Sequence, residues 1–174
     1  MPQPPPRMTL VLGGARSGKS AYAEGLIEAC PGPWLYLATA QAFDDEMRAR
    51  IAEHRARRDR GWHTTEAPLD LPGALRAAGE LPVLVDCLTL WLGNVLLGGH
   101  DVAEAEAALG AALDDRTAPT VLVSNEVGLG IVPDNALARH FRDHAGRLHQ
   151  SLAARADHVT LLVAGLPLAV KGSA

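Results

Sequence analysis

The stretch GGARSGKS, residues 13–20, follows the apolar run MTLVL at residues 8–12. It matches the pattern G-x-x-x-x-G-K-[ST] of a phosphate-binding loop in full. The glycines allow the backbone to fold into a nest of N–H groups around an anion, and Lys19 places a cation on the outer phosphates. Ser20 can hold a magnesium ion, and a helix that begins near Gly18 adds the positive end of its dipole. The stretch therefore predicts a strand, a loop and a helix that together bind a nucleoside triphosphate.

Length and charge limit what else the chain can be. Its 174 residues, 48% of them hydrophobic, are enough for one well-buried domain, which we place at residues 8–174. Residues 1–7 contain four prolines and lack the apolar core of a signal peptide, so we expect a disordered tail there. The net charge of −4 gives no indication of a nucleic-acid partner, because such domains usually carry a basic surplus.

The cysteines and the longest apolar run indicate a cytoplasmic protein without a membrane span. Cys30 and Cys87 lie far apart and have no metal-binding spacing, which suits a reducing compartment; both are expected to be buried. Residues 81–99 are long enough to cross a bilayer, but Asp86 and Asn94 interrupt them. A buried strand followed by a buried helix fits this run better.

Five apolar runs alternate with helical patterns along the chain. They lie at about residues 8–13, 34–39, 82–87, 120–124 and 158–164. This alternation is typical of an α/β fold with a mainly parallel sheet and helices on both faces.

A second informative segment is DDEMRARIAEHRARRDR, residues 44–60. Asp44 is a suitable N-cap, and acidic residues precede basic ones, so we expect a helix. Met47, Ile51 and His54 share one stripe of it, which turns His54 toward the protein body or a cleft.

The surroundings of His54 leave two interpretations open. A lone histidine is more often a packed or surface residue than a catalytic one. However, a cluster of arginines around it (Arg50, Arg55, Arg57, Arg58) repels itself unless an anion such as a triphosphate sits there. Neutral imidazole is a nucleophile toward phosphorus, and guanidinium groups would stabilise the charge on departing pyrophosphate.

Two strand ends supply further candidates. The run LPVLVD ends in Asp86, which would support a magnesium ion together with Ser20; a turn or cap residue is the alternative. Asn125 and Glu126 follow the run TVLVS at the expected ligand edge, where an asparagine-containing turn is an equally good interpretation. His140 and His144 have zinc-ligand spacing, but no suitable third ligand accompanies them, so we expect no zinc.

Several of these segments together resemble one family. They are GGARSGKS, ATAQ (38–41), DDEMRARIAEHRARR, VDCLTLWLGN, NEVGLGIVPDNALARHFRDHAGRLHQSLA and the closing AGLPLAVKG. They resemble the bifunctional adenosylcobinamide kinase and adenosylcobinamide-phosphate guanylyltransferase of cobalamin biosynthesis, over about residues 8–172. The resemblance implies a RecA-like P-loop fold and two successive reactions.

The first implied reaction transfers a phosphoryl group from a nucleoside triphosphate, ATP or GTP, to a hydroxyl of adenosylcobinamide. In the second, GTP gives its GMP to adenosylcobinamide phosphate and releases pyrophosphate. The resemblance implies that the GMP passes through a covalent bond to a histidine, which is His54 here. A phosphoramidate suits two successive in-line transfers because it retains much of the transfer potential of the triphosphate.

The resemblance also implies the nucleotide contacts and the assembly. The contacts correspond to Gly13, Gly14, Ala15, Arg16, Ser17, Gly18, Lys19, Ser20, Ala38, Thr39, Ala40, Arg55, Ala56, Arg57, Arg58, Glu66 and Asp86. Homotrimers with active sites near subunit boundaries are implied as well. One departure is visible: His149 stands where the resemblance leads us to expect asparagine.

Two other functions are compatible with a phosphate loop. One is a simple small-molecule kinase in which His54 only packs. The other is a nucleotide-binding switch or ATPase module that acts on a protein partner, although the sequence lacks an N-K-x-D motif for reading guanine. Labelling of the protein by GTP separates the first from the bifunctional enzyme.

Overall fold

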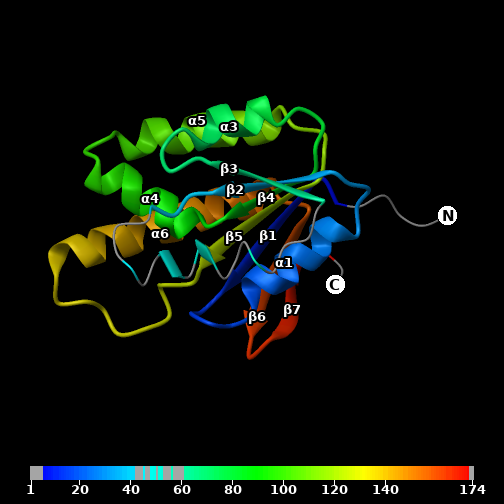
Figure 1. The fold of residues 1–174 in the computed structure, drawn as a ribbon. Coiled ribbons are helices and arrows are strands. Elements are labelled where there is room, and N and C mark those ends of the chain that lie inside the picture. The colour runs from blue at the N-terminus through cyan, green and yellow to red at the C-terminus, as the bar shows by residue number, and fades with distance from the viewer. Residues whose placement is uncertain are drawn as a thin grey trace.

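The computed structural model describes residues 6–41, 45, 48–49, 51–52, 56 and 61–172, which contain a seven-stranded sheet (Figure 1). The strands are β1 (Met8–Gly13), β2 (Trp34–Ala38), β3 (Trp62–Glu66), β4 (Val83–Asp86), β5 (Thr120–Asn125), β6 (His158–Val163) and β7 (Leu166–Lys171). Their order across the sheet is β3-β2-β4-β5-β1-β6-β7. All neighbouring pairs are parallel except β6 and β7. The predicted mainly parallel sheet is confirmed.

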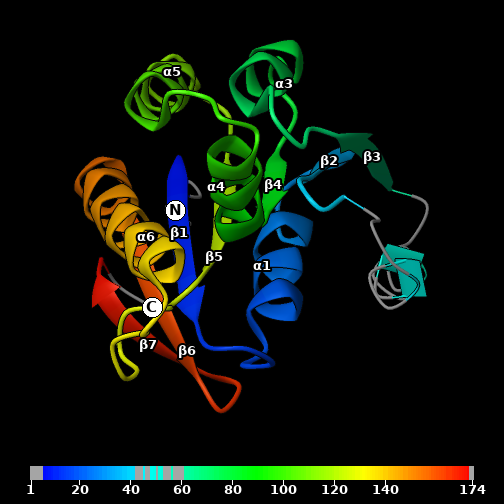
Figure 2. The ribbon, with the colours of Figure 1, turned by 90° about the vertical axis from the view of Figure 1, so that its left-hand side faces the viewer.

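Helices cover both faces of this sheet, as Figure 2 shows. They are α1 (Lys19–Glu28), α3 (Leu71–Ala77), α4 (Leu88–Leu97), α5 (Val102–Asp114) and α6 (Ala136–Arg155). Ala23 and Ile27 of α1 pack in one apolar cluster with Val11 and Val123 of the sheet. The other four helices enclose a second, larger cluster on the opposite face, around the fully buried Trp91.

The connections that follow two adjacent strands run to opposite faces of the sheet. The chain leaves β1 through α1 on one face, and it leaves β5 through α6 on the other (Figure 2). Because β1 and β5 are neighbours, their carboxyl ends flank the crevice where open α/β sheets bind ligands. The fold therefore places the loop after β1 in the expected ligand position.

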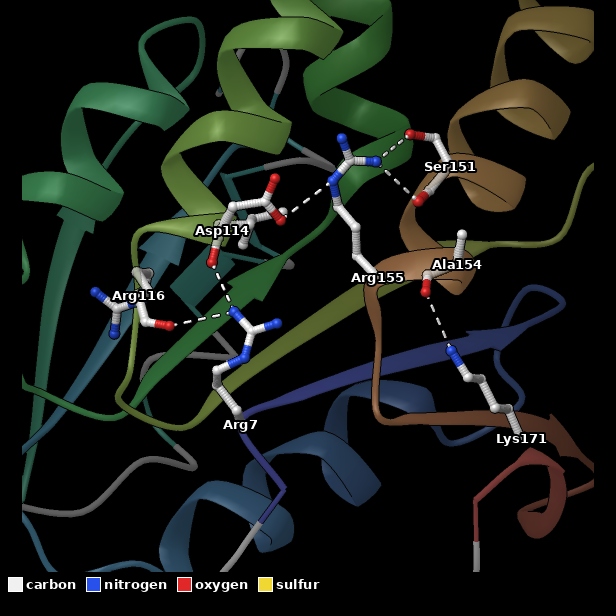
Figure 3. A network of polar contacts seen from close by, with 8 residues as sticks. Arg7, Asp114, Arg116, Ser151, Ala154, Arg155 and Lys171 are labelled. Carbon is white, nitrogen blue, oxygen red and sulfur yellow. Dashed lines mark hydrogen bonds and ion pairs between the residues drawn. The ribbon is translucent and has the colours of Figure 1, made fainter.

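Polar contacts tie the elements together at the amino end of β1, away from this crevice (Figure 3). Arg7 Nη1 donates to the carbonyl oxygens of Leu113, at 3.0 Å, and Arg116, at 3.2 Å. Arg155 on α6 pairs with Asp114 on α5, with 3.3 Å between Nε and Oδ1. The side chain of Arg116 is buried and donates to Thr120 Oγ1 and to three backbone carbonyls, those of Leu75, Gly79 and Leu81.

The predicted strands agree with the observed ones to within about a residue, but two strands were missed. β3 was missed because four of its five residues are polar and exposed. β7 is apolar in sequence but exposed along its whole length, and its Pro167 argues against a strand. The run at 81–99 forms β4 and α4, as predicted. Within the described residues, none of the helices has both the length and the hydropathy to cross a bilayer.

Two predicted segments are only partly described. Of the predicted helix at 44–60, residues 45, 48–49, 51–52 and 56 are described, and they are helical. Residues 1–5 of the predicted tail lie outside the described residues.

Candidate nucleotide site at the carboxyl edge of the sheet

The strand register brings three predicted site residues into one row. Ala38 at the end of β2 pairs with Glu66 of β3 on one side and with Asp86 of β4 on the other. Gly13, the last residue of β1, lies two residues beyond this row in the direction of the strands and pairs with Asn125 of β5. Residues far apart in the sequence therefore meet at one edge because parallel strands all end there.

The loop 13–18 has the backbone that its glycines predict. Gly18 has a φ of 94°, in the left-handed region where a side chain is strained. A Cβ on Gly13 would lie 2.8 Å from the carbonyl oxygen of Leu162, so only glycine fits beside β6. Arg16 also has a positive φ, 55°.

Three carbonyls of this loop are held by hydrogen bonds. The N–H of Glu126 donates to Gly13 O at 2.9 Å, and the N–H of Gly165 donates to Ser17 O at 3.0 Å. Lys19 Nζ donates to Gly14 O at 2.6 Å. In a trans peptide the next N–H points opposite to the carbonyl. Each contact therefore fixes the direction of an N–H in the predicted anion nest.

The start of α1 is left open for an anion. Its N-cap is Gly18, which provides no side-chain cap, and its first turn has no acidic residue. Helix α4 shares this lack of a cap, whereas α3, α5 and α6 begin with Asp70, Asp101 and Asn135, each of which accepts from a backbone N–H of the first turn. The free N–H groups and the dipole of α1 favour a bound phosphate.

Lys19 lies where its charge can act on that phosphate. The residue is only 8% exposed. Burial lowers the pKa of its ammonium group, and the nearby carboxylate of Asp86 counteracts this shift. The cation is thus held between the loop and the end of β4.

Asp86 and the end of β2 are fixed by contacts that the sequence did not reveal. Tyr36 Oη donates to Asp86 Oδ2 at 3.1 Å. Thr39 is fully buried; its hydroxyl donates to Cys87 O at 2.7 Å and accepts from Cys87 N at 2.8 Å. Asn94 Nδ2 donates to Thr39 O at 2.9 Å. Tyr36 and Asn94 were missed because both come from apolar segments whose pairing appears only in the fold.

The end of β5 forms a second polar group beside the loop. Asn125 Nδ2 donates to Thr89 Oγ1 at 2.9 Å. His149 of α6 is buried against Ser124 and Glu126, and its ring occupies the place where the resemblance implied asparagine. Cys30 and Cys87 are both buried free cysteines, as predicted.

Four predicted residues, His54, Arg55, Arg57 and Arg58, lie outside the described residues, whereas Ala56 is helical and exposed. On α6, the rings of His140 and His144 are 4.5 Å apart and edge to face. Across the described part of the chain, no group of three or more His, Cys, Asp or Glu residues is placed to hold a metal ion.

Residues 9–170 match the model of the family described as cobinamide kinase / cobinamide phosphate guanyltransferase. The chain belongs to this family. A bifunctional adenosylcobalamin biosynthesis protein, CobP, from Pseudomonas aeruginosa is 51% identical over 94% of this chain and 96% of its own length. The corresponding protein CobU from Salmonella typhimurium is 46% identical over 94% of this chain and 99% of its own length. This cobinamide kinase and guanyltransferase family was the one implied by the sequence motifs.

Two solved structures have a fold similar to that of this chain. An ATPase from the type III secretion system of pathogenic bacteria has a TM-score of 0.57 at 11% identity, over 90% of this chain and 51% of that one. A protein from Pyrococcus horikoshii has a TM-score of 0.56 at 11% identity, over 97% and 87%. The fold is that of a P-loop NTPase, as predicted.

Proposed function

We propose that this protein phosphorylates adenosylcobinamide with a nucleoside triphosphate and then transfers GMP from GTP to adenosylcobinamide phosphate, giving adenosylcobinamide-GDP and pyrophosphate. The observation that carries this function is the uncapped start of α1, with Lys19 and Asp86 beside it, in a chain that matches the bifunctional family over nearly its whole length. Kinase and guanylyl transfer both need a triphosphate held at that place.

In the second reaction, we assign the nucleophile to His54. An imidazole nitrogen attacks the α-phosphorus of GTP, a P–N bond forms, and the bond to pyrophosphate breaks. A phosphate oxygen of adenosylcobinamide phosphate then attacks the same phosphorus and releases the imidazole. Arg55, Arg57 and Arg58 would stabilise the charge on pyrophosphate. These assignments depend on the sequence motif.

The phosphate loop and its neighbours would hold the nucleotide. Backbone N–H groups within residues 13–20 would face the phosphates, except that of Ser17, which donates to Gly14 O at 3.4 Å. The carbonyls of Gly13 and Ser17 accept from Glu126 and Gly165, outside the loop. Because the side chain of Thr39 is fully buried, residues 38–40 would contact the nucleotide through their backbone and through Ala40. Glu66 lies at the end of the row through Ala38 and Asp86, and we assign it to the GTP site.

The residues present fit a magnesium ion. Ser20 lies in the first turn of α1, and Asp86 ends the strand next but one to β1, close enough to Lys19 to influence the pKa of its ammonium group. A hydroxyl and a carboxylate are hard oxygen ligands, which Mg²⁺ prefers together with substrate phosphates. When bound, the ion would neutralise charge on the phosphate oxygens. Tyr36 would keep Asp86 oriented for this role.

We also propose that the protein is a cytoplasmic homotrimer that uses both ATP and GTP. Exposed apolar side chains support assembly: Leu166, Leu168 and Val170 of β7 are 71%, 56% and 63% exposed on the free edge of the sheet. Long apolar edge strands of this kind favour association with another chain.

The test uses GTP labelled at the α-phosphate, followed by denaturation. We expect label to stay on the wild-type protein, to be absent from His54→Ala, and to leave on addition of adenosylcobinamide phosphate. Retained kinase activity with no label on the protein would identify a simple kinase. Slow GTP hydrolysis unaffected by cobinamide, with a protein partner retained in one nucleotide state, would identify a switch.

A further inference from the structure

A buried histidine links α6 to the end of β5. Ser124 lies in β5, and Glu126 follows directly after the strand ends at Asn125. Both side chains lie near His149 of α6. His149 lies opposite them and is 8% exposed. Its Nε2 is 2.7 Å from Ser124 Oγ, and its Nδ1 is 3.9 Å from Glu126 Oε2. The ring is therefore hydrogen-bonded to Ser124 and lies beside the Glu126 carboxylate, at a distance too long for a hydrogen bond.

This Ser-His-Glu order matches that of a hydrolytic triad, but the burial argues against such a role. Ser124 has no exposed surface, so no substrate can reach its hydroxyl. The side chain of Glu126, which is 23% exposed, is the member that reaches outward. The ring therefore lies where it can support Glu126, which is beside it.

The electrostatics define how the ring is used. Burial lowers the pKa of His149, and the Glu126 carboxylate counteracts the shift, so the ring is neutral at pH 7. The carboxylate favours the tautomer with its N–H at Nδ1. Nε2 then accepts a hydrogen bond from the Ser124 hydroxyl. In this tautomer the Nδ1–H group is the donor nearest to the carboxylate, with 3.9 Å between Nδ1 and Oε2.

Glu126 in turn fixes the turn that follows β5. Its Oε1 accepts from the N–H of Gly128 at 2.5 Å. Arg142, seven residues before His149 on α6, donates to Gly128 O at 2.5 Å. The N–H of Glu126 donates to Gly13 O, which directs the next N–H, that of Gly14, the opposite way. A shift of Glu126 would thus misdirect an N–H of the phosphate loop.

We propose that His149 is a positioning residue of the nucleotide site, which acts through Glu126 on the first peptide of the phosphate loop. The inference rests on the nucleotide binding that the proposed function requires, and on no step of the transfer chemistry. It predicts that the contact at Nδ1 matters for GTP binding and that the contact at Nε2 matters much less.

The two contacts can be separated by amide side chains. The amide of asparagine overlays Nδ1 of histidine, and that of glutamine overlays Nε2, so His149→Asn keeps the polar contact with Glu126 while His149→Gln keeps the one with Ser124. We expect His149→Asn to bind a fluorescent ribose-modified GTP within twofold of wild type. We expect His149→Gln and His149→Leu to raise the Kd about tenfold. Glu126→Gln should raise it similarly, and combining it with His149→Gln should add little.

His144→Leu is the matched control, because it alters the same helix on a side that faces Glu106 of α5. It should leave the Kd unchanged at equal thermal stability. Equal weakening by His149→Asn and His149→Gln, or a stronger effect of His149→Asn, would overturn the inference, as would unchanged binding in all variants. If the wild type binds GTP but forms no adenosylcobinamide-GDP, the proposed function fails, while the order of the two amide variants still decides the role of His149.

Discussion

Removal of the Tyr36 hydroxyl group tests whether Asp86 supports a magnesium ion. Tyr36→Phe deletes the donor to Asp86 Oδ2, at 3.1 Å, and keeps the ring that packs edge to face against Trp62. Hydrogen bonds to charged groups contribute about 1.5–3 kcal/mol. Asp86 is only partly buried, so water can replace part of the lost contact. The expected loss is therefore at the low end, about 1.5 kcal/mol, or roughly tenfold.

This loss should appear in the magnesium dependence of the reactions. We expect Tyr36→Phe to raise the Mg²⁺ concentration for half-maximal kinase activity about tenfold and to leave the melting temperature nearly unchanged. Tyr22→Phe is the control, because Tyr22 packs against the same apolar cluster from α1. The reasoning is refuted if both variants have the magnesium dependence of the wild type, or if activity falls equally at saturating magnesium.

Three further predictions concern stability and the loop. Arg116→Met leaves three backbone carbonyls without their donor and should lower the free energy of unfolding by about 3 kcal/mol, a fall of about 6–12 °C in Tm. The control Arg155→Met removes a more exposed side chain at the same edge and should lower it by less than about 1 kcal/mol. Equal Tm shifts of the two variants in calorimetry would contradict this. Gly18→Ala should abolish GTP binding, because Gly18 has a φ of 94° that strains a residue with a side chain. The control Gly25→Ala has open space around its Cβ, so it should bind GTP normally and gain about 0.5–1 kcal/mol of stability. Normal GTP binding by Gly18→Ala would show that the loop tolerates a side chain. Burial lowers the pKa of His149 and of His144 below the unfolded value of about 6.5. The unfolded chain therefore binds more protons, and the free energy of unfolding should fall as the pH drops from 7 toward 5. In urea titrations His149→Asn should reduce the dependence of this free energy on pH, and an unchanged dependence would show that His149 does not contribute to it.

Sequence patterns were sufficient for the buried part of the fold. Strands β1 and β5 read as apolar runs because they are covered on both faces, and the phosphate loop has a required spacing. β7 was missed although Leu166, Leu168 and Val170 alternate, because Pro167 interrupts its short run and argues against a strand.

The candidate site was predictable only where one residue type is required by the chemistry. Lys19 and Asp86 follow from phosphate and magnesium binding, and the structure brings them together. Tyr36, Asn94 and His149 act through partners that are distant in the sequence, so their roles depend on strand register and helix placement. The role of His54 stays a prediction, since it lies outside the described residues.

The hairpin of β6 and β7 gives the end of the chain an unexpected importance. Gly165, at its tip, holds the carbonyl of Ser17, and its Cα is 3.4 Å from where a Cβ on Gly18 would be. Strand β7 looks dispensable, since Leu166–Lys171 are all exposed. Yet a truncation or a fusion tag that unpairs β7 would remove the hydrogen bond that holds the Ser17 carbonyl. GTP affinity would then fall more than thermal stability.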